Sequence, residues 1–309
     1  MVTATAAQEP PHPSNPRNWA HQLRTIDGAH IVPTEDRTLV QPCGVFDQDR
    51  SYCHDAVLWR RKPLMVPPEQ PAFAEDAPLK GTYLWGGVLH GHFGHFLVES
   101  IGRLWGYAAA DAHLDGVLFM EKRAERGEGS AAVAWHSEDA PLLRSFQAEM
   151  FKQFGIAAPI GLVSAPVQVE RLVVPGQGFG MGAMAEGTPA FRAFVQDRVG
   201  QDIAPDGPER LYISRSAFGA RRGGVIGEQI LEQQLEQDGF TVFHPQTESI
   251  PAQIARYKAA RRIVAADGSA SVRASSVLEP SSSSRKYSTS STGIVPWSST
   301  PKIRFARRP

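Results

Sequence analysis

The spacing of apolar residues predicts alternating strands and helices in the C-terminal part of the chain. The apolar run at 211–213 is typical of a buried strand, and the pattern over 228–238 predicts a helix that ends at Gly239, before the next strand. Ser249 is a suitable N-cap for a second helix, which precedes another apolar run at 263–265. This βαβαβ order predicts half of a Rossmann-like parallel sheet.

The N-terminal part shows the same alternation in a looser form. Apolar runs predict three strands, at 83–89, 117–120 and 171–174. Helical spacing predicts three amphipathic helices, over 93–110, 142–154 and 188–199. Residues 1–80 are rich in proline, which favours loops and short strands. We therefore expect an α/β protein with two lobes, residues 1–187 and 188–270.

Composition fits a folded globular chain. Of 309 residues, 42% are hydrophobic and 21% are charged, as in ordinary globular proteins. Cys43 and Cys53 cannot form a disulfide framework and do not make a CxxC pair, which favours a reducing compartment. The N-terminus lacks the features of a signal peptide, and no apolar stretch is long enough to cross a membrane. We expect a cytoplasmic protein with at most peripheral contact with the inner membrane.

Charge is balanced overall but unevenly distributed. The chain has 32 basic and 32 acidic residues, which gives no electrostatic indication of nucleic-acid binding. Residues 271–309 contain seven of the basic residues and one acid, so this segment carries +6 and residues 1–270 carry −6. The segment is also rich in serine and lacks apolar periodicity, so we expect a disordered tail. It could be flexible, contact an anionic surface, or result from a shifted reading frame.

A dense polar cluster lies at the start of the helix expected from residue 93. If that helix is regular, His95, Glu99 and Arg103 are successive i, i+4 neighbours on one face. Such a line of side chains can orient a hydroxyl, accept its proton, or hold a phosphate near the helix N-terminus. His90 and His92 precede it.

Two other interpretations of this cluster remain open. His90, His92, His95 and Glu99 are all possible ligands of zinc or iron, but their spacing matches no standard zinc motif. The histidines could also be structural groups that form hydrogen bonds at the start of a helix.

Two further clusters follow predicted strands. Arg215 and Arg222 lie in the loop after the strand at 211–213, where open α/β sheets bind ligands and where arginine suits phosphate. The small residues at 268–270 follow the last predicted strand and could let backbone N–H groups approach a pyrophosphate. Neither a GxGxxG nor a P-loop motif is present.

Together these segments, from residue 81 to residue 270, resemble glycosyltransferase family 61. The first block of similarity runs from His92 to Trp105 and reads HFGHFLVESIGRLW. The second runs from Arg210 through Glu228 to the Gly-Ser-Ala sequence at 268–270, in the family's order and at about its spacing.

The resemblance implies a GT-B-like enzyme with two Rossmann-like lobes and an active site between them. It implies that residues 1–187 form the acceptor-side lobe and residues 188–270 an incomplete nucleotide-sugar lobe. The expected reaction moves a sugar from a nucleotide sugar, expected to be UDP-linked, to a glycan acceptor. It is expected to be inverting and to need no cofactor or metal, and capsular or surface polysaccharide is the expected product.

The resemblance also implies roles for individual residues. Glu99 or His95 would be the catalytic base, with His92 and Arg103 facing the acceptor or supporting the site. The donor would be bound by a set of residues in the second lobe: Arg215, Arg222, Glu228, Gly268, Ser269 and Ala270. Of these, the arginines would neutralise the diphosphate, residues 268–270 would contact it through the backbone, and Glu228 would support the loop or touch the nucleotide.

The sequence departs from the family pattern near its C-terminal end. Gly227 and Asp267 stand where the family commonly has Asn and His, and the serine-rich tail begins where the family continues with an apolar helix. The C-terminus is therefore expected to be truncated or frame-shifted. Two alternatives follow: an inactive family member that binds a nucleotide or glycan, and a metal-dependent enzyme that uses the histidine cluster.

Overall fold

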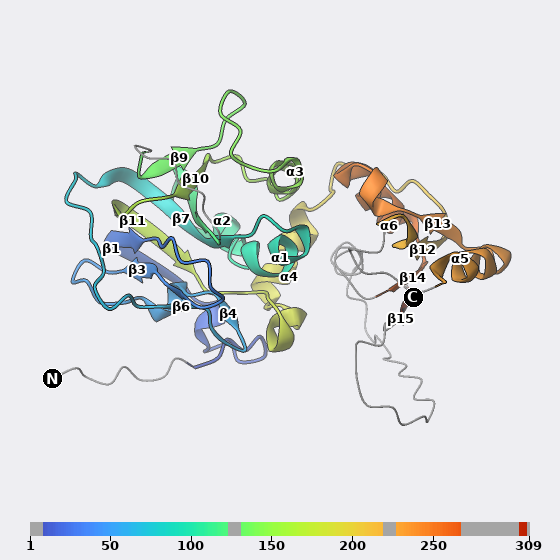
Figure 1. The fold of residues 1–309 in the computed structure, drawn as a ribbon, viewed down its shortest axis with the longest axis horizontal. Coiled ribbons are helices and arrows are strands. Elements are labelled where there is room, and N and C mark those ends of the chain that lie inside the picture. The colour runs from blue at the N-terminus through green and yellow to red at the C-terminus, as the bar shows by residue number, and fades with distance from the viewer. Residues whose placement is uncertain (1–8, 123–130, 219–226, 267–302, 308–309) are drawn as a thin grey trace. The chain divides into compact units, whose positions relative to one another are not determined.

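The described residues form two compact units. The computed structural model describes residues 9–122, 131–218, 227–266 and 303–307. One unit lies within residues 1–195 and the other within residues 196–309 (Figure 1). The division falls inside helix α4 (Pro189–Arg198), whereas the sequence placed it just before this helix.

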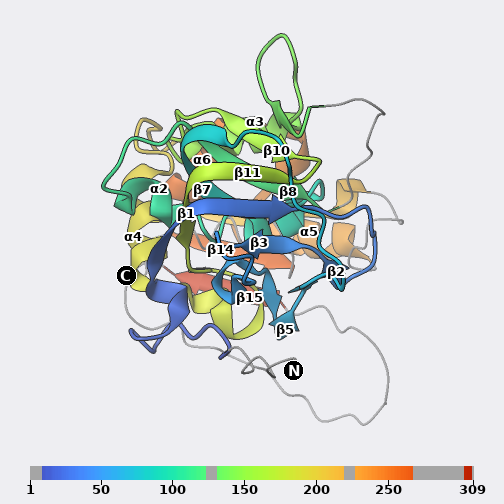
Figure 2. The same ribbon diagram turned by 90° about the vertical axis from the view of Figure 1, so that its left-hand side faces the viewer.

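The first unit contains a seven-stranded mixed sheet with the order β3-β1-β11-β7-β8-β10-β9. Its strands are β1 (Leu23–Val32), β3 (Gly44–Phe46), β7 (Leu79–Leu89), β8 (Gly116–Glu121), β9 (Val133–Trp135), β10 (Ile160–Val163) and β11 (Val167–Pro175). Strands β11, β7, β8 and β10 are parallel, while β1, β3 and β9 pair antiparallel. Figure 2 shows β1, β11 and β7 side by side.

The prediction of a Rossmann-like first lobe is thus right only for the parallel centre of this sheet. The long strand β1 was missed because Gly28, with φ +62°, lies inside it and interrupts the apolar alternation. The other elements before β7 are short, as the prolines predicted. They are β2 (Gln41–Pro42), β4 (Trp59–Arg60), β5 (Lys62–Pro63), β6 (Met65–Val66) and the 3₁₀ turns at Trp19–His21 and His54–Ala56.

Both faces of the sheet are covered with apolar side chains. Tyr83 and Trp85 on β7 belong to the core formed with residues 43–65 on one face. Successive strand residues point to opposite faces, so the fully buried Leu84 lies on the other face. There Phe119 packs against Phe151 of helix α3 (Ser145–Gln153), with ring centroids 5.5 Å apart.

The prediction of one regular helix over 93–110 is wrong in detail. The chain forms α1 (Phe93–His95), a π-helical turn (Phe96–Ser100), and α2 (Trp105–Ala109) after an intervening turn. A π turn contains more residues per turn than an α-helix, so it changes the direction of every side chain that follows. Consequently the 3.6-residue spacing, which predicted His95, Glu99 and Arg103 on one helix face, holds only as far as Glu99.

The second unit confirms the predicted βαβαβ order. Strands β12 (Arg210–Ile213), β13 (Thr241–Phe243) and β14 (Arg262–Ala266) are parallel, and helices α5 (Glu228–Gln237) and α6 (Ile250–Ala259) connect them. The Ser249 side chain accepts a hydrogen bond from the Ala252 N–H, as an N-cap should. Strand β12 lies between β13 and β14, which is the 2-1-3 order of flavodoxin-like sheets rather than the 3-2-1 order of the Rossmann fold.

The predicted disordered tail, residues 271–309, lies outside the described residues except for one strand. Residues 303–307 form β15, which pairs antiparallel with β14, so the prediction of disorder does not hold for these five residues. Among the described residues, no helix is both long and apolar enough to cross a membrane.

Candidate active site

Glu99 is the centre of the polar cluster in the first unit. It lies in the π turn, and its side chain is fully buried. Its Oε2 is 2.6 Å from Nδ1 of His95, so the predicted i, i+4 contact between these two residues is confirmed. The side chain of His95 is 42% exposed, which gives it access to solvent that Glu99 lacks.

Arg60 is a member of this cluster that the sequence analysis missed. Its Nε donates to Oε1 of Glu99 at 2.6 Å, and its Nη2 donates to Oε2 of the same carboxylate. Nη2 also lies 3.2 Å from Nδ1 of His95. Arg60 ends the two-residue strand β4 in the proline-rich segment, where neither periodicity nor a motif distinguishes it from Arg61.

The geometry selects one tautomer of neutral His95. Burial raises the pKa of Glu99, but the hydrogen bond from Arg60, the charges of His90 and Arg60, and the hydrogen bond from His95 together hold it below its ordinary value. An ionised carboxylate only accepts hydrogen bonds, so Nδ1 of His95 must carry the proton. The lone pair of His95 is then on Nε2.

His90 packs behind this pair. Its ring stacks on that of His95 with centroids 5.3 Å apart, and its Nε2 is 3.8 Å from Oε2 of Glu99. This buried nitrogen has no hydrogen-bond partner in the described part of the chain. Burial lowers the pKa of His90 to about 4, more than the nearby Glu99 raises it, so the ring is neutral near pH 7.

The remaining predicted residues of this cluster lie differently. His92 is exposed, and its ring meets that of His95 edge-on at 5.4 Å. Arg103 is buried and does not continue the line of His95 and Glu99. Its Nη2 donates to the Val57 carbonyl at 2.6 Å and its Nη1 to the Pro175 carbonyl. Arg103 is therefore in a supporting position, because the π turn directs it into the core.

Three atoms of the cluster could ligate a metal ion. Nitrogens of His90 and His95 and an oxygen of Glu99 lie within 4.8 Å of one another, and His92 is outside this group. However, the guanidinium of Arg60 contacts both Oε2 of Glu99 and Nδ1 of His95. A cation bound to these atoms would have to displace this positive group, so the set fits a metal poorly while Arg60 is in place.

In the second unit, Glu228 joins the end of β12 to the start of α5. Its Oε1 accepts hydrogen bonds from the Tyr212 hydroxyl at 2.8 Å and the Arg215 N–H at 2.9 Å. Its Oε2 is buried and has no partner among the described residues. Glu232, which the sequence analysis did not single out, accepts from Ser214 and Ser216 through its Oε1. Arg222 and residues 268–270 lie outside the described residues.

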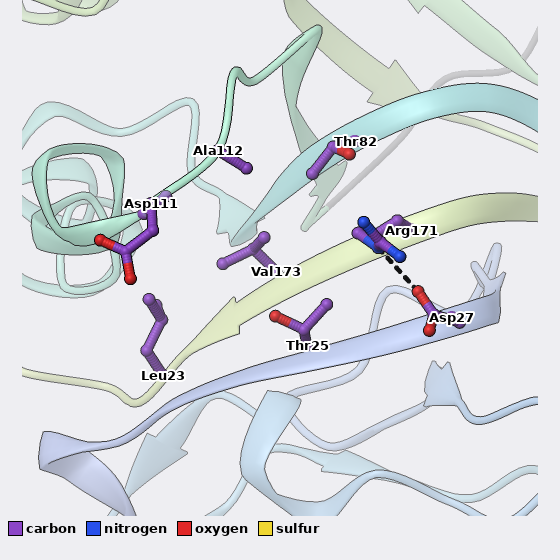
Figure 3. A pocket seen from close by; sticks show the side chains of 9 residues that line it. Leu23, Thr25, Asp27, Thr82, Asp111, Ala112, Arg171 and Val173 are labelled. Atoms are coloured by element: carbon purple, nitrogen blue, oxygen red, sulfur yellow. Dashed lines mark hydrogen bonds and ion pairs between the residues drawn. The ribbon is translucent and has the colours of Figure 1, made fainter.

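A separate depression lies on the first unit. It has a volume of about 390 Å³, and its lining includes Thr25 and Asp27 of β1 and Arg171 of β11 (Figure 3). Asp27 and Arg171 form an ion pair of 2.7 Å, but both side chains are more than half exposed. The lining includes no member of the His95–Glu99 cluster, so this depression is not the candidate active site.

The comparison with known families identifies the chain. Residues 93–276 match the model of the family described as Glycosyltransferase 61. The chain belongs to glycosyltransferase family 61. It is accordingly a glycosyltransferase, an enzyme that takes a sugar donor and a glycan acceptor. The match to family 61 begins at the helix of His95 and includes His95, Glu99 and Arg103, and also Glu228 and Glu232, whereas Arg60, His90 and His92 lie before it. No match was found among the curated proteins compared with the chain.

Proposed function

We propose that this family 61 enzyme transfers a sugar from a nucleotide donor, UDP-linked by expectation, to a hydroxyl of a glycan acceptor, with His95 as the base. The contact of 2.6 Å between Nδ1 of His95 and the buried carboxylate of Glu99 carries this proposal. It leaves Nε2 of His95 as the proton acceptor. Glu99 is the orienting group rather than the base, because its side chain is fully buried and Arg60 engages both of its oxygens.

The reaction is a single displacement. Nε2 of His95 takes the proton of the acceptor hydroxyl as its oxygen attacks the anomeric carbon of the donor. The bond between that carbon and the diphosphate oxygen breaks, and the nucleoside diphosphate leaves with the electron pair. Attack opposite the leaving group inverts the configuration. We propose no metal in this step, since the diphosphate can be stabilised by arginine.

Donor binding is assigned to the second unit, as one lobe of a GT-B-like enzyme. In a sheet of 2-1-3 order, ligands bind at the carboxyl ends of the strands where the order reverses, here β12 and β14. Arg215 follows β12, and its N–H is held by Glu228. Arg222 and residues 268–270 remain proposed contacts to the diphosphate. The proposed setting is the cytoplasm, with at most peripheral membrane contact, in capsular or surface polysaccharide synthesis.

A donor panel and two substitutions test this function. Binding of the correct nucleotide raises the melting midpoint of the chain by mass action, with or without chelator. With the sugar donor so identified, His95→Ala should lower kcat by about 10²–10⁴-fold, the usual contribution of a general base. Glu99→Gln should lower it less, because the base is still present.

The matched control is His113→Ala, since the side chain of His113 is 88% exposed and outside the cluster. This variant should transfer sugar at the wild-type rate. A folded His95→Ala variant with wild-type kcat would disprove the assignment of the base. Sugar turnover by the wild-type chain would exclude the alternative of an inactive binding protein.

A further inference from the structure

The segment that carries Arg60 is unusually well anchored for a strand of two residues. Four successive carbonyls, those of residues 56–59, each accept a hydrogen bond from another part of the first unit. Trp85 Nε1 donates to the Ala56 carbonyl at 2.9 Å, and the Leu64 N–H donates to the Leu58 carbonyl at 2.8 Å.

The other two carbonyls are bound by buried polar side chains. Arg103 donates to the Val57 carbonyl at 2.6 Å and also to the Pro175 carbonyl at the end of β11. Gln177 binds Trp59 twice: its Oε1 accepts from the Trp59 N–H at 2.8 Å, and its Nε2 donates to the Trp59 carbonyl at 3.1 Å. A reciprocal pair of this kind fixes the peptide groups on either side of Trp59.

These bonds hold the backbone directly before Arg60. Arg60 follows Trp59 directly, and its guanidinium donates hydrogen bonds to both carboxylate oxygens of Glu99. Such a planar, two-point contact depends on orientation as well as charge, which a lysine ammonium cannot reproduce. Arg60 lies outside residues 93–276, so the family match does not contain it.

We propose that Arg60 is a positioning residue for the base His95, and that Arg103 and Gln177 hold Arg60 in place. The inference rests on the proposed function. Arg60 fixes the plane of the Glu99 carboxylate, and Glu99 in turn fixes the Nδ1–H tautomer and the ring orientation of His95. Arg103, which was expected to face the acceptor or to support the site, acts at a distance through the strand that carries Arg60.

The test compares Arg60→Gln and Arg60→Lys with Arg171→Gln as the control. Arg171 is half exposed and pairs with Asp27 away from the cluster. Arg60→Gln should lower kcat at least 30-fold and change the KM for the acceptor less than threefold. Arg60→Lys keeps the positive charge and should restore part of the lost kcat. Arg171→Gln should have the kcat and KM of the wild type. A rise in KM with unchanged kcat would overturn the proposal, since Arg60 would then bind the acceptor directly.

Nitrogen NMR of His95 in the full chain supplies a readout that does not depend on activity. The wild type should show Nδ1 protonated and Nε2 unprotonated, and Arg60→Gln should show a mixture of tautomers or a protonated ring. An unchanged His95 signal in a folded Arg60→Gln variant would overturn the proposal. The NMR experiment needs no substrate. If the wild-type chain transferred no sugar, the proposed function would be contradicted, but the spectra of wild type and Arg60→Gln would still decide whether Arg60 positions His95.

Gln177→Met provides a second route if Arg60→Gln does not fold. It frees the peptide groups of Trp59 and leaves Arg60, Glu99 and His95 intact. We expect a kcat at least fivefold below wild type together with the same change in the His95 signal. Wild-type kcat and an unchanged signal in this variant would overturn the proposal.

Discussion

The Tyr212 hydroxyl donates a hydrogen bond of 2.8 Å to Oε1 of Glu228, and both residues are at least 99% buried. The bond ties the central strand β12 to the first turn of α5. Burial is the main reason, and Glu228 a further one, that the pKa of Tyr212 lies above its ordinary value. Tyr212 is therefore a neutral donor at every physiological pH.

The first prediction follows from this contact. Glu228→Ala should destabilise the second unit by about 2–4 kcal/mol, because the buried Tyr212 hydroxyl and the Arg215 N–H both lose this acceptor. Tyr212→Phe should cost about 1–2 kcal/mol, since it removes one donor. Urea unfolding measures both. Glu236→Ala, on the exposed side of α5, is the control and should change stability by less than about 0.5 kcal/mol.

The second prediction concerns acid stability and His90. Its pKa is lowered to about 4 in the folded chain from 6.5, so below pH 6.5 the unfolded chain binds a proton that the folded chain does not. Stability should therefore fall as the pH drops from 6.5 to 4, by up to about 3 kcal/mol from this residue. His90→Leu should lack this component. Parallel stability–pH curves for wild type and variant, measured by urea unfolding, would contradict the prediction.

Glu99 should act in a different pH window. Its folded pKa is held below the ordinary value of 4.5, so its contribution is complete above that pH and is lost only as the pH falls further. Glu99→Gln should thus leave the slope between pH 6.5 and 4.5 unchanged and flatten the curve below it. A changed slope in the upper window would show that Glu99 is protonated at higher pH than the structure indicates.

The third prediction concerns metal binding. Arg60→Ala removes the guanidinium that contacts both Glu99 and His95, and it leaves the donor atoms of His90, His95 and Glu99 together. Two imidazoles and a carboxylate suit Zn²⁺, so this variant should bind one Zn²⁺ at least tenfold more tightly than wild type. Calorimetry and elemental analysis measure this. The double variant Arg60→Ala/His90→Ala is the control and should lose the gain, and equally tight binding by wild type would refute the competition.

The fourth prediction concerns the stability that the buried side chain of Arg103 contributes. Burial is the main reason that the pKa of its guanidinium is lowered, to about 10, and it holds the Val57 and Pro175 carbonyls. Arg103→Met should cost about 2–4 kcal/mol of stability because both carbonyls lose a charged donor. The fraction that folds should show the same loss of kcat as Gln177→Met. Full stability would contradict the packing described above, and urea unfolding decides it.

Local sequence patterns predicted much of the second unit and part of the first. The strands around Leu211 and Val264, the cap at Ser249 and the contact between His95 and Glu99 all depend on residues a few positions apart. Propensity, capping and helical spacing act over that distance, so the chain itself carries these features. The same reasoning failed at the π turn, because a single extra residue in a turn leaves no clear mark in apolar periodicity.

The sequence by itself determined the α/β alternation, the family and the contact between His95 and Glu99. Only the tertiary structure decided which of that pair is exposed, and it added Arg60, which is 39 positions from Glu99. Arg60 directly follows Trp59, whose peptide groups are bound by Gln177, just beyond the end of β11 and far along the chain. The contact between Arg60 and Glu99 depends on how segments far apart in the sequence pack together. No local sequence pattern encodes such packing, so the sequence alone could not predict this contact.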